Sequence, residues 1–135
     1  MNANCVGNRY PDSFGNFAVA SSVPVFLGAT GNAVATLATV GTSYIVRRVT
    51  VAGASGSVAL ANVTILTSSD GNTSNAVTNA AALSTITGTT KFQDLPLSTA
   101  AASTVYTSSL YVYVGTAAAA NNSVDVTVYG DVVSL

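Results

Sequence analysis

The sequence predicts an all-β protein: a single-domain antiparallel β-sandwich, with a jelly roll as the favoured topology and an extended N-terminal arm. Runs rich in Val, Ile, Tyr and Thr recur along the 135 residues, and such side chains suit a pleated, half-buried surface. Connections rich in Gly, Asn and Ser separate these runs, as turns do. No segment keeps a helical period over about ten residues. A chain of this length is sufficient for one domain with its own core.

Residues 1–22 are expected to form the arm. A proline and two glycines interrupt any helix there, while Tyr10, Phe14 and Phe17 recur at a spacing of three to four residues. Ordering such a segment costs conformational entropy, so its aromatic side chains need a surface on which to dock. That surface belongs either to the chain's own domain or to a neighbouring chain, and both possibilities stay open at this stage.

The β-sandwich domain is expected to span residues 23–135. Two runs within 44–67 flank the segment AGASGS and predict an antiparallel strand pair. Long crossovers at 68–82 and 98–105 favour Greek-key wiring over an up-and-down meander, and residues 75–82 form either one helical turn or an irregular crossover. About eight strands are expected, at residues 23–27, 33–40, 43–51, 58–67, 83–87, 91–97, 110–114 and 124–133.

Alternation within three of these strands predicts which side chains face the core. In the strand at 110–114, Leu and Val alternate with Tyr111 and Tyr113, which places the tyrosines on the outer face. The strand at 124–128 shows the cleanest alternation, with valines inward. In the strand at 58–67, the residues expected to face inward are Ala59, Ala61, Val63 and Ile65, opposite Leu60, Asn62 and Thr64.

Arg47 and Arg48 are adjacent within a predicted strand. Because neighbouring residues of a regular strand point to opposite faces, one arginine is expected on the same face as apolar residues. Either the strand lifts off the core, or one arginine pairs with an aspartate, or that face is an interface. The last two explanations are favoured jointly.

Charge is scarce in this chain. Charged residues make up 7 % of the sequence, against about 25 % in an ordinary soluble domain. This composition indicates either a Ser/Thr/Asn surface or a protein that works inside an assembly, where few charges lose water on docking. Four basic residues and a net charge of −1 cannot build a phosphate-tracking patch, so no nucleic-acid binding is expected.

Catalytic equipment is missing from the sequence. There is no histidine to act as a base, and one cysteine without histidine cannot form a zinc site. Asp70 and Asn72 lie in a polar loop, but carboxylates at calcium-loop spacing do not follow, so a turn is predicted there. We therefore expect no enzyme activity, no cofactor and no metal. The N-terminus lacks the features of a secretory signal and no apolar run reaches membrane-spanning length, so no membrane partner is expected.

The chain resembles the decoration, or cement, proteins that coat the heads of tailed bacteriophages. The resemblance lies in the run VFLGATGNAVATLATVGTSYIVRRVTV at 25–51, KFQDLPL at 91–97, LYVYVGTAAA at 110–119 and the closing VDVTVYGDVVSL. It implies a jelly roll or another β-sandwich that forms a homotrimer and clamps neighbouring subunits of the major capsid protein. It also implies a place on the outer surface of the virion, assembled in the host cytoplasm, and it supplies no catalytic residue.

The main alternative is a receptor- or glycan-binding β-sandwich of a phage fibre or baseplate. Tryptophan, frequent in glycan sites, is absent, but exposed tyrosines keep this function open. Tyr and Arg are enriched where interfaces concentrate their binding energy. The candidate interface residues are Tyr10, Phe14, Phe17, Arg47, Arg48, Tyr111 and Tyr113.

Overall fold

The computed structural model describes residues 17–22, 24–39 and 43–133, and this part of the chain contains strands and two 3-10 turns but no α-helix. This confirms the all-β prediction. The 3-10 turns are η2 (Thr73–Asn75) and η3 (Thr99–Ser103). The strands are β1 (Phe17–Ser21), β2 (Val25–Phe26), β3 (Gly31–Thr39), β4 (Tyr44–Ala52), β5 (Asn62–Leu66), β6 (Ala81–Ala82), β7 (Gln93–Leu95), β8 (Leu110–Thr116) and β9 (Ser123–Val132).

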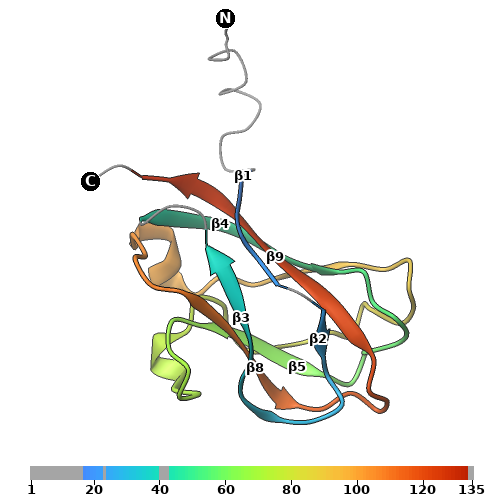
Figure 1. The fold of residues 1–135 in the computed structure, drawn as a ribbon. Helices are drawn as coiled ribbons and strands as arrows, with labels where there is room; N and C mark the ends of the chain where they lie inside the picture. Colours follow the sequence, from blue (N-terminus) through green and yellow to red (C-terminus); the bar gives the residue numbers. More distant parts are fainter. Residues whose placement is uncertain (1–16, 23, 40–42, 134–135) are drawn as a thin grey trace, which may run out of the picture.

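The strands form two antiparallel sheets that pack face to face as a β-sandwich (Figure 1). One sheet has the order β1-β9-β4-β7, with β2 continuing the line of β1 along β9. The other has the order β6-β5-β8-β3. Strand β1 joins the two sheets, because it pairs with β9 along its length and with β3 through Ala20 and Ser21.

The strands pair in a nested order. With β1 and β2 counted as one interrupted strand, the first strand pairs with the last, β3 with β8, β4 with β7, and β5 with β6. A chain folded as one long hairpin and then rolled into two sheets has this order, which is that of a jelly roll. As a consequence, the connections of the sandwich gather at its two ends.

The predicted strand pair within 44–67 is wrong. Strand β4 lies between β9 and β7, whereas β5 lies between β8 and β6, so the two strands belong to different sheets. The connection 53–61 crosses from one sheet to the other and contributes Val58 and Ala61, both fully buried, to the core. A crossover of Gly, Ala and Ser has the same composition as a hairpin turn, so local sequence cannot separate them.

The predicted strand at 83–87 is also wrong, because this stretch follows β6 as a turn. Leu83 and Ile86 are nonetheless fully buried. The Leu83 N–H donates to the Ala61 carbonyl at 2.8 Å, and the Val58 N–H donates to the Ile86 carbonyl at 3.0 Å. The apolar pattern that predicted a strand therefore marks two side chains that close one end of the core.

The sandwich already includes Phe17, so its predicted start at residue 23 is wrong. Strand β1 lies within the segment expected to be an arm, yet it pairs with β9, and Val19 on it is fully buried. Ser22 continues this pairing: its N–H donates to the Val126 carbonyl, and its hydroxyl accepts from the Val126 N–H, each at 2.9 Å. Residues 1–16 lie outside the described part of the chain.

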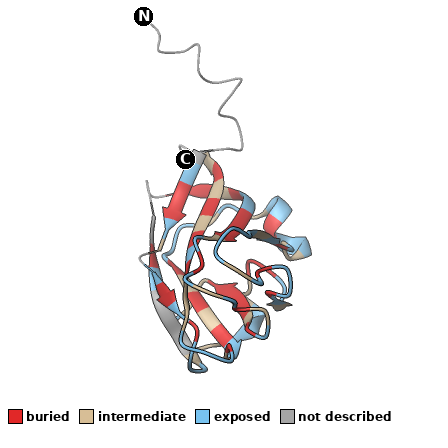
Figure 2. Ribbon diagram, turned by 90° about the vertical axis from the view of Figure 1, so that its right-hand side faces the viewer, coloured by how far each residue is buried: buried red, intermediate tan, exposed pale blue. Residues whose placement is uncertain are grey.

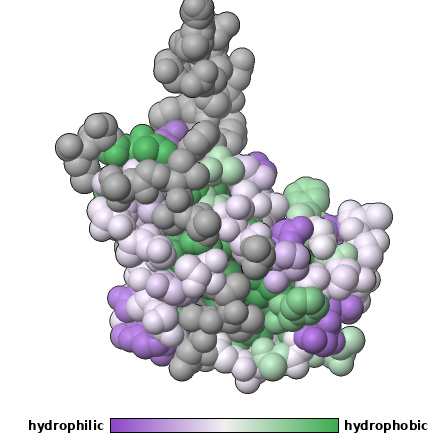
Figure 3. Space-filling view, in the orientation of Figure 1, coloured by the Kyte–Doolittle hydropathy of each residue, from purple (hydrophilic) through white to green (hydrophobic). Residues whose placement is uncertain are grey.

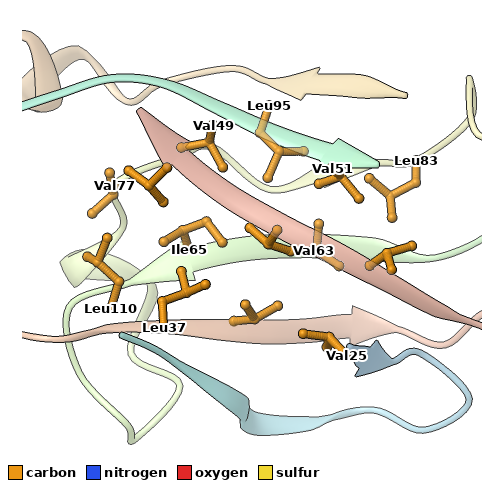
Figure 4. Packing of buried hydrophobic residues seen from close by; sticks show 14 of the residues in the cluster. Val25, Leu37, Val49, Val51, Val63, Ile65, Val77, Leu83, Leu95 and Leu110 are labelled. Carbon is orange, nitrogen blue, oxygen red and sulfur yellow. The ribbon is translucent and has the colours of Figure 1, made fainter. Parts of the chain in front are cut away.

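The core lies between the sheets and consists mainly of Val, Leu and Ile (Figure 4). Buried and exposed stretches alternate along the strands (Figure 2). The predicted inward residues of β8 and β9 are buried, and so are Ala61, Val63 and Ile65. Thr64, expected on the opposite face, is also only 3 % exposed. Full burial of each such aliphatic side chain contributes about 1.5–3 kcal/mol, so this core is the main stabilising feature.

Candidate interaction surfaces

The two outer faces of the sandwich differ in charge. The outer surface of β1-β9-β4-β7, here called the charged face, carries all the ionisable Arg and Asp residues found in the described strands: Arg47, Arg48, Asp94, Asp125 and Asp131. The outer surface of β6-β5-β8-β3, here called the tyrosine face, carries Tyr111 and Tyr113, and no Arg, Lys, Asp or Glu occurs in its strands. The two faces point in opposite directions because the sheets pack against each other.

A β-bulge in β4 places both arginines on the charged face. Val46 pairs with Gly130 and Arg48 pairs with Tyr129, so Arg47 is the extra residue of the bulge. A bulge shifts the alternation of the strand by one residue. The expectation that the two arginines point to opposite faces is therefore wrong, and both are exposed.

The bulge also keeps the core side of β4 apolar along its whole length. Tyr44 and Val46 are buried before the bulge, and Val49 and Val51 are buried after it. In a regular strand, these two pairs would point to opposite faces. The extra residue therefore brings both pairs into the core without burying a charge.

Both arginines pair with aspartates of neighbouring strands, as expected for one of them. Arg47 Nε lies 3.2 Å from Asp131 Oδ2. Arg48 Nε lies 3.6 Å from Asp94 Oδ1 and donates to Thr50 Oγ1 at 3.2 Å. Exposed ion pairs contribute at most about 1 kcal/mol each, so these pairs orient the guanidinium groups more than they stabilise the fold.

The Arg48 side chain has one further contact, with the ring of Tyr129. Its Cζ lies 5.0 Å from the centre of the Tyr129 ring, within the range of a cation–π interaction. The Thr50 hydroxyl, which accepts from Arg48, donates to Asp94 Oδ1 at 2.6 Å. Four side chains from β4, β7 and β9 thus form one connected polar cluster on this face.

Two exposed phenylalanines lie beside the charged face and were not among the predicted interface residues. Phe26 on β2 is 56 % exposed and Phe92, which precedes β7, is 61 % exposed. Phe26 alternates with Val25 and Leu27, which are buried. This alternation in the sequence could have identified Phe26 as an outward-facing residue. In the view of Figure 3, strongly hydrophilic residues occur as separate purple spots, with pale and hydrophobic green areas between them.

On the tyrosine face, both predicted tyrosines are half-buried and project outward. Tyr111 pairs with Thr36 on β3 and with Leu66 on β5, and Tyr113 pairs with Thr64. Cross-strand neighbours on one face lie close enough for their side chains to pack. The two tyrosines of β8 therefore lie beside the exposed Thr36 of β3, whereas Thr64 and Leu66 of β5 are buried.

The structure does not bring the seven predicted interface residues together. Arg47 and Arg48 lie on one face, and Tyr111 and Tyr113 lie on the other. Phe17 begins β1, where its backbone pairs with Gly130. Tyr10 and Phe14 lie outside the described residues.

The loop around Asp70 is a turn, as predicted. Asp70 Oδ1 accepts from the Ser68 hydroxyl at 2.6 Å and from the Asn72 N–H at 3.0 Å, and Gly71 has a φ of 74°. These hydrogen bonds, the one from Ser68 first, lower the pKa of the Asp70 carboxyl. Nowhere in the described residues do three or more His, Cys, Asp or Glu side chains gather as a metal site would require.

Tyr44 has the most strongly perturbed ionisation among the tyrosines that the structure describes. Burial, and secondarily the neighbouring Tyr106, raise its pKa to about 12. Its hydroxyl donates to the Ser108 carbonyl at 2.6 Å, and its ring centre lies 6.0 Å from that of Tyr106. A buried phenol with a satisfied hydrogen bond is a structural group that anchors β4 to the segment before β8.

Comparison of the chain with protein families, with curated proteins and with solved structures finds no match. Within the residues that the structure describes, no helix is long and apolar enough to cross a membrane. The class that the geometry defines is an antiparallel β-sandwich with one charged and one uncharged outer face. Its function has to be argued from those faces.

Proposed function

We propose that this protein is a non-catalytic structural protein of a bacteriophage virion, which binds the outer surface of the capsid and stabilises the head. Its partner is the major capsid protein, and it joins the head in the host cytoplasm. The resemblance to decoration proteins supports this proposal, and so does the jelly-roll order, which recurs in viral structural proteins and in lectins. Because a fold alone does not determine function, the proposal rests on the chemical character of the two outer faces.

The observation that carries the proposal is the uncharged tyrosine face. The strands of this face contain no charged side chain, so binding through it takes no charged group of these strands out of water. Association through this face therefore avoids the large free-energy cost of desolvating charges. Tyr111 and Tyr113 offer large rings with a polar tip, the kind of side chain that is enriched at interfaces. A capsid-binding protein needs such a surface, since it must be soluble alone and lose little on docking.

The resemblance to decoration proteins supports a homo-oligomer, with a trimer as the proposed state. Closed rings are built from heterologous contacts, in which two different surfaces of each subunit meet. Because the tyrosine face is assigned to the capsid, one of these surfaces is placed on the charged face, where the Arg48 cluster supplies an anchor.

Binding to heads tests the proposed function. Purified protein is sedimented with the DNA-filled heads of the phage that encodes it, and the same preparation is applied to a glycan array. We expect saturable cosedimentation, weakened at least about tenfold by Tyr113→Ala, because loss of an aromatic anchor costs more than about 1.4 kcal/mol. Lys91→Ala, in the loop before β7, is the matched control and keeps wild-type binding.

The alternative function gives a different result in the same experiment. A receptor- or glycan-binding protein is retained on the array and stays in the supernatant when heads are sedimented. That outcome would contradict capsid decoration. Equal binding of Tyr113→Ala and wild type to heads would instead remove the tyrosine face from the contact.

A further inference from the structure

A small pocket lies at the end of the sandwich that carries both 3-10 turns, the yellow-green η2 and the orange η3 in Figure 1. It has a volume of about 220 Å³ and is lined by three separate segments. Thr67 comes from the end of β5, Ser74 and Asn75 come from η2, and Ala100, Thr104 and Tyr106 come from η3 and the residues after it. No charged side chain lines it.

Three of the four hydroxyl groups that line this pocket donate their protons to the chain itself. Thr67 Oγ1 donates to the Asn75 carbonyl at 3.3 Å, and Thr104 Oγ1 donates to the Ala100 carbonyl at 2.6 Å. Ser74 Oγ donates to the Asn72 side-chain oxygen at 2.8 Å. Each hydroxyl has one proton and two lone pairs, so these three oxygens are left as acceptors.

The hydrogen-bonding groups that line the pocket determine which class of ligand it can bind. Anions such as phosphate or carboxylate favour sites with a basic side chain or several donors. This pocket has no basic side chain, and its donors are the Tyr106 hydroxyl and the amide of Asn75, which already donates to Ser68 Oγ at 3.1 Å. Hard cations need carboxylates, and the pocket has none. A neutral molecule that carries several hydroxyl groups supplies the missing donors and pays no charge desolvation.

The size and the apolar surfaces of the pocket agree with one ring of such a molecule. An apolar cavity of about 150 Å³ holds one benzene ring, so about 220 Å³ holds one saccharide ring with its hydroxyls. Ala100 and the half-buried ring of Tyr106 supply apolar surface for the C–H face of the sugar. Burial raises the pKa of Tyr106, so its phenol stays neutral.

We infer that the pocket between η2 and η3 is a binding site for one neutral saccharide ring. Thr67, Ser74 and Thr104 accept hydrogen bonds from the ring hydroxyls, and Tyr106 contacts its apolar face. The inference is independent of the proposed capsid function, because the pocket lies at one end of the sandwich and not on either outer face.

Amide chemical shifts of the full chain, titrated with methyl glycosides of glucose, galactose, mannose and N-acetylglucosamine, test this inference. At least one of them should shift amides of residues 67–76 and 100–106, with a dissociation constant on the order of 1 mM, as expected for a single ring. Inorganic phosphate and acetate at the same concentration should leave these amides unchanged. Absence of shifts at about 50 mM saccharide would overturn the inference, because that is far above the expected dissociation constant.

Two variants localise the binding. Ala100→Leu fills the pocket from an exposed position, and Thr104→Val removes one acceptor at nearly constant volume. Each should weaken saccharide binding at least about tenfold. Ala119→Leu, an equally exposed position in the loop between β8 and β9, should bind like wild type. Unchanged affinity in both pocket variants, or shifts confined to other residues, would show that the pocket is not the site.

Discussion

Gly130 permits the bulge that organises the charged face. It lies on β9 opposite Val46, where the extra residue of β4 pushes the neighbouring backbone toward it. A Cβ at Gly130 would lie 2.9 Å from the Ile45 carbonyl carbon and 3.2 Å from Val46 Cα, and even closer to the Ile45 carbonyl oxygen. These are backbone atoms, which cannot move aside as the end of a side chain can.

Gly130→Ala should therefore be strongly destabilising. We expect a loss of more than about 2 kcal/mol, as for other substitutions that force the backbone to shift, and hence a melting temperature lower by roughly 6 °C or more. Thermal unfolding followed by circular dichroism measures it. Gly88→Ala is the control, since nothing lies within 4 Å of an added Cβ there. Equal melting temperatures for the two variants would mean that the bulge is not rigid.

At the scale of strands and sheets, the division of charge follows from which strands share a sheet. Strands β4, β7 and β9 are distant in sequence, yet their pairing brings Arg48, Asp94 and Tyr129 into one cluster. Strands β5 and β8 pair in the other sheet and contribute only uncharged residues to its outer face. The two faces therefore differ in charge because of the order in which the strands pair.

The proposed trimer gives a prediction for these two faces. Light scattering at micromolar concentration should give a mass of about 40 kDa, three times the 13.4 kDa of one chain. Because the Arg48 cluster is placed in the subunit contact, Arg48→Ala should lower this mass. Tyr113→Ala, on the face assigned to the capsid, and Lys91→Ala should not. A wild-type monomer, or a trimer that Arg48→Ala leaves unchanged, would exclude this arrangement.

The whole molecule is unusual in how few of its groups titrate near neutral pH. The sequence contains no histidine, so no imidazole changes charge between about pH 5 and 8. The largest perturbation among the described residues is that of Tyr44, whose pKa rises from 10.0 to about 12 on folding. Stability should consequently respond to alkali before it responds to small changes around pH 7.

The sign of this response follows from proton linkage. A group whose pKa is higher in the folded state binds its proton more tightly there, so its contribution is complete below the unfolded pKa and is lost as pH rises through the folded value. For Tyr44 this range is from about pH 10 to about 12. Tyr106, whose pKa is also raised, acts in the same direction.

Urea unfolding at a series of pH values should show stability nearly constant from pH 6 to 9 and falling above about 10. Tyr44→Phe cannot ionise, so its stability curve should fall less steeply in that range, although the variant starts lower because it lacks the hydrogen bond to Ser108. Tyr111→Phe, on the outer face, should keep the wild-type slope. Parallel curves for Tyr44→Phe and wild type would show that Tyr44 is not the responsible group.

The sequence by itself determined the fold class and the inward and outward faces of β8 and β9. Alternation in 110–114 and 124–128 is a local property, and each side chain there lies where its period predicted. The composition also identified tyrosine and arginine as the candidate contact residues. The pairing of strands cannot be predicted from local sequence, because it depends on contacts between residues far apart in the chain. The sequence does not show whether 53–61 is a hairpin or a crossover, or whether Leu83 and Ile86 belong to a strand or a turn. Both depend on which strands pair in each sheet.

The tertiary structure alone decided how the candidate residues are grouped. Arg47 and Arg48 share a face because a bulge opposite Gly130 shifts the alternation, and a bulge needs a specific partner strand. The tyrosines lie on the opposite side because β8 and β4 are in different sheets. The pocket joins residues 67, 75 and 104, which no sequence period relates to one another. Sequence patterns report the environment of one element, whereas a surface or a pocket exists only after several elements have packed.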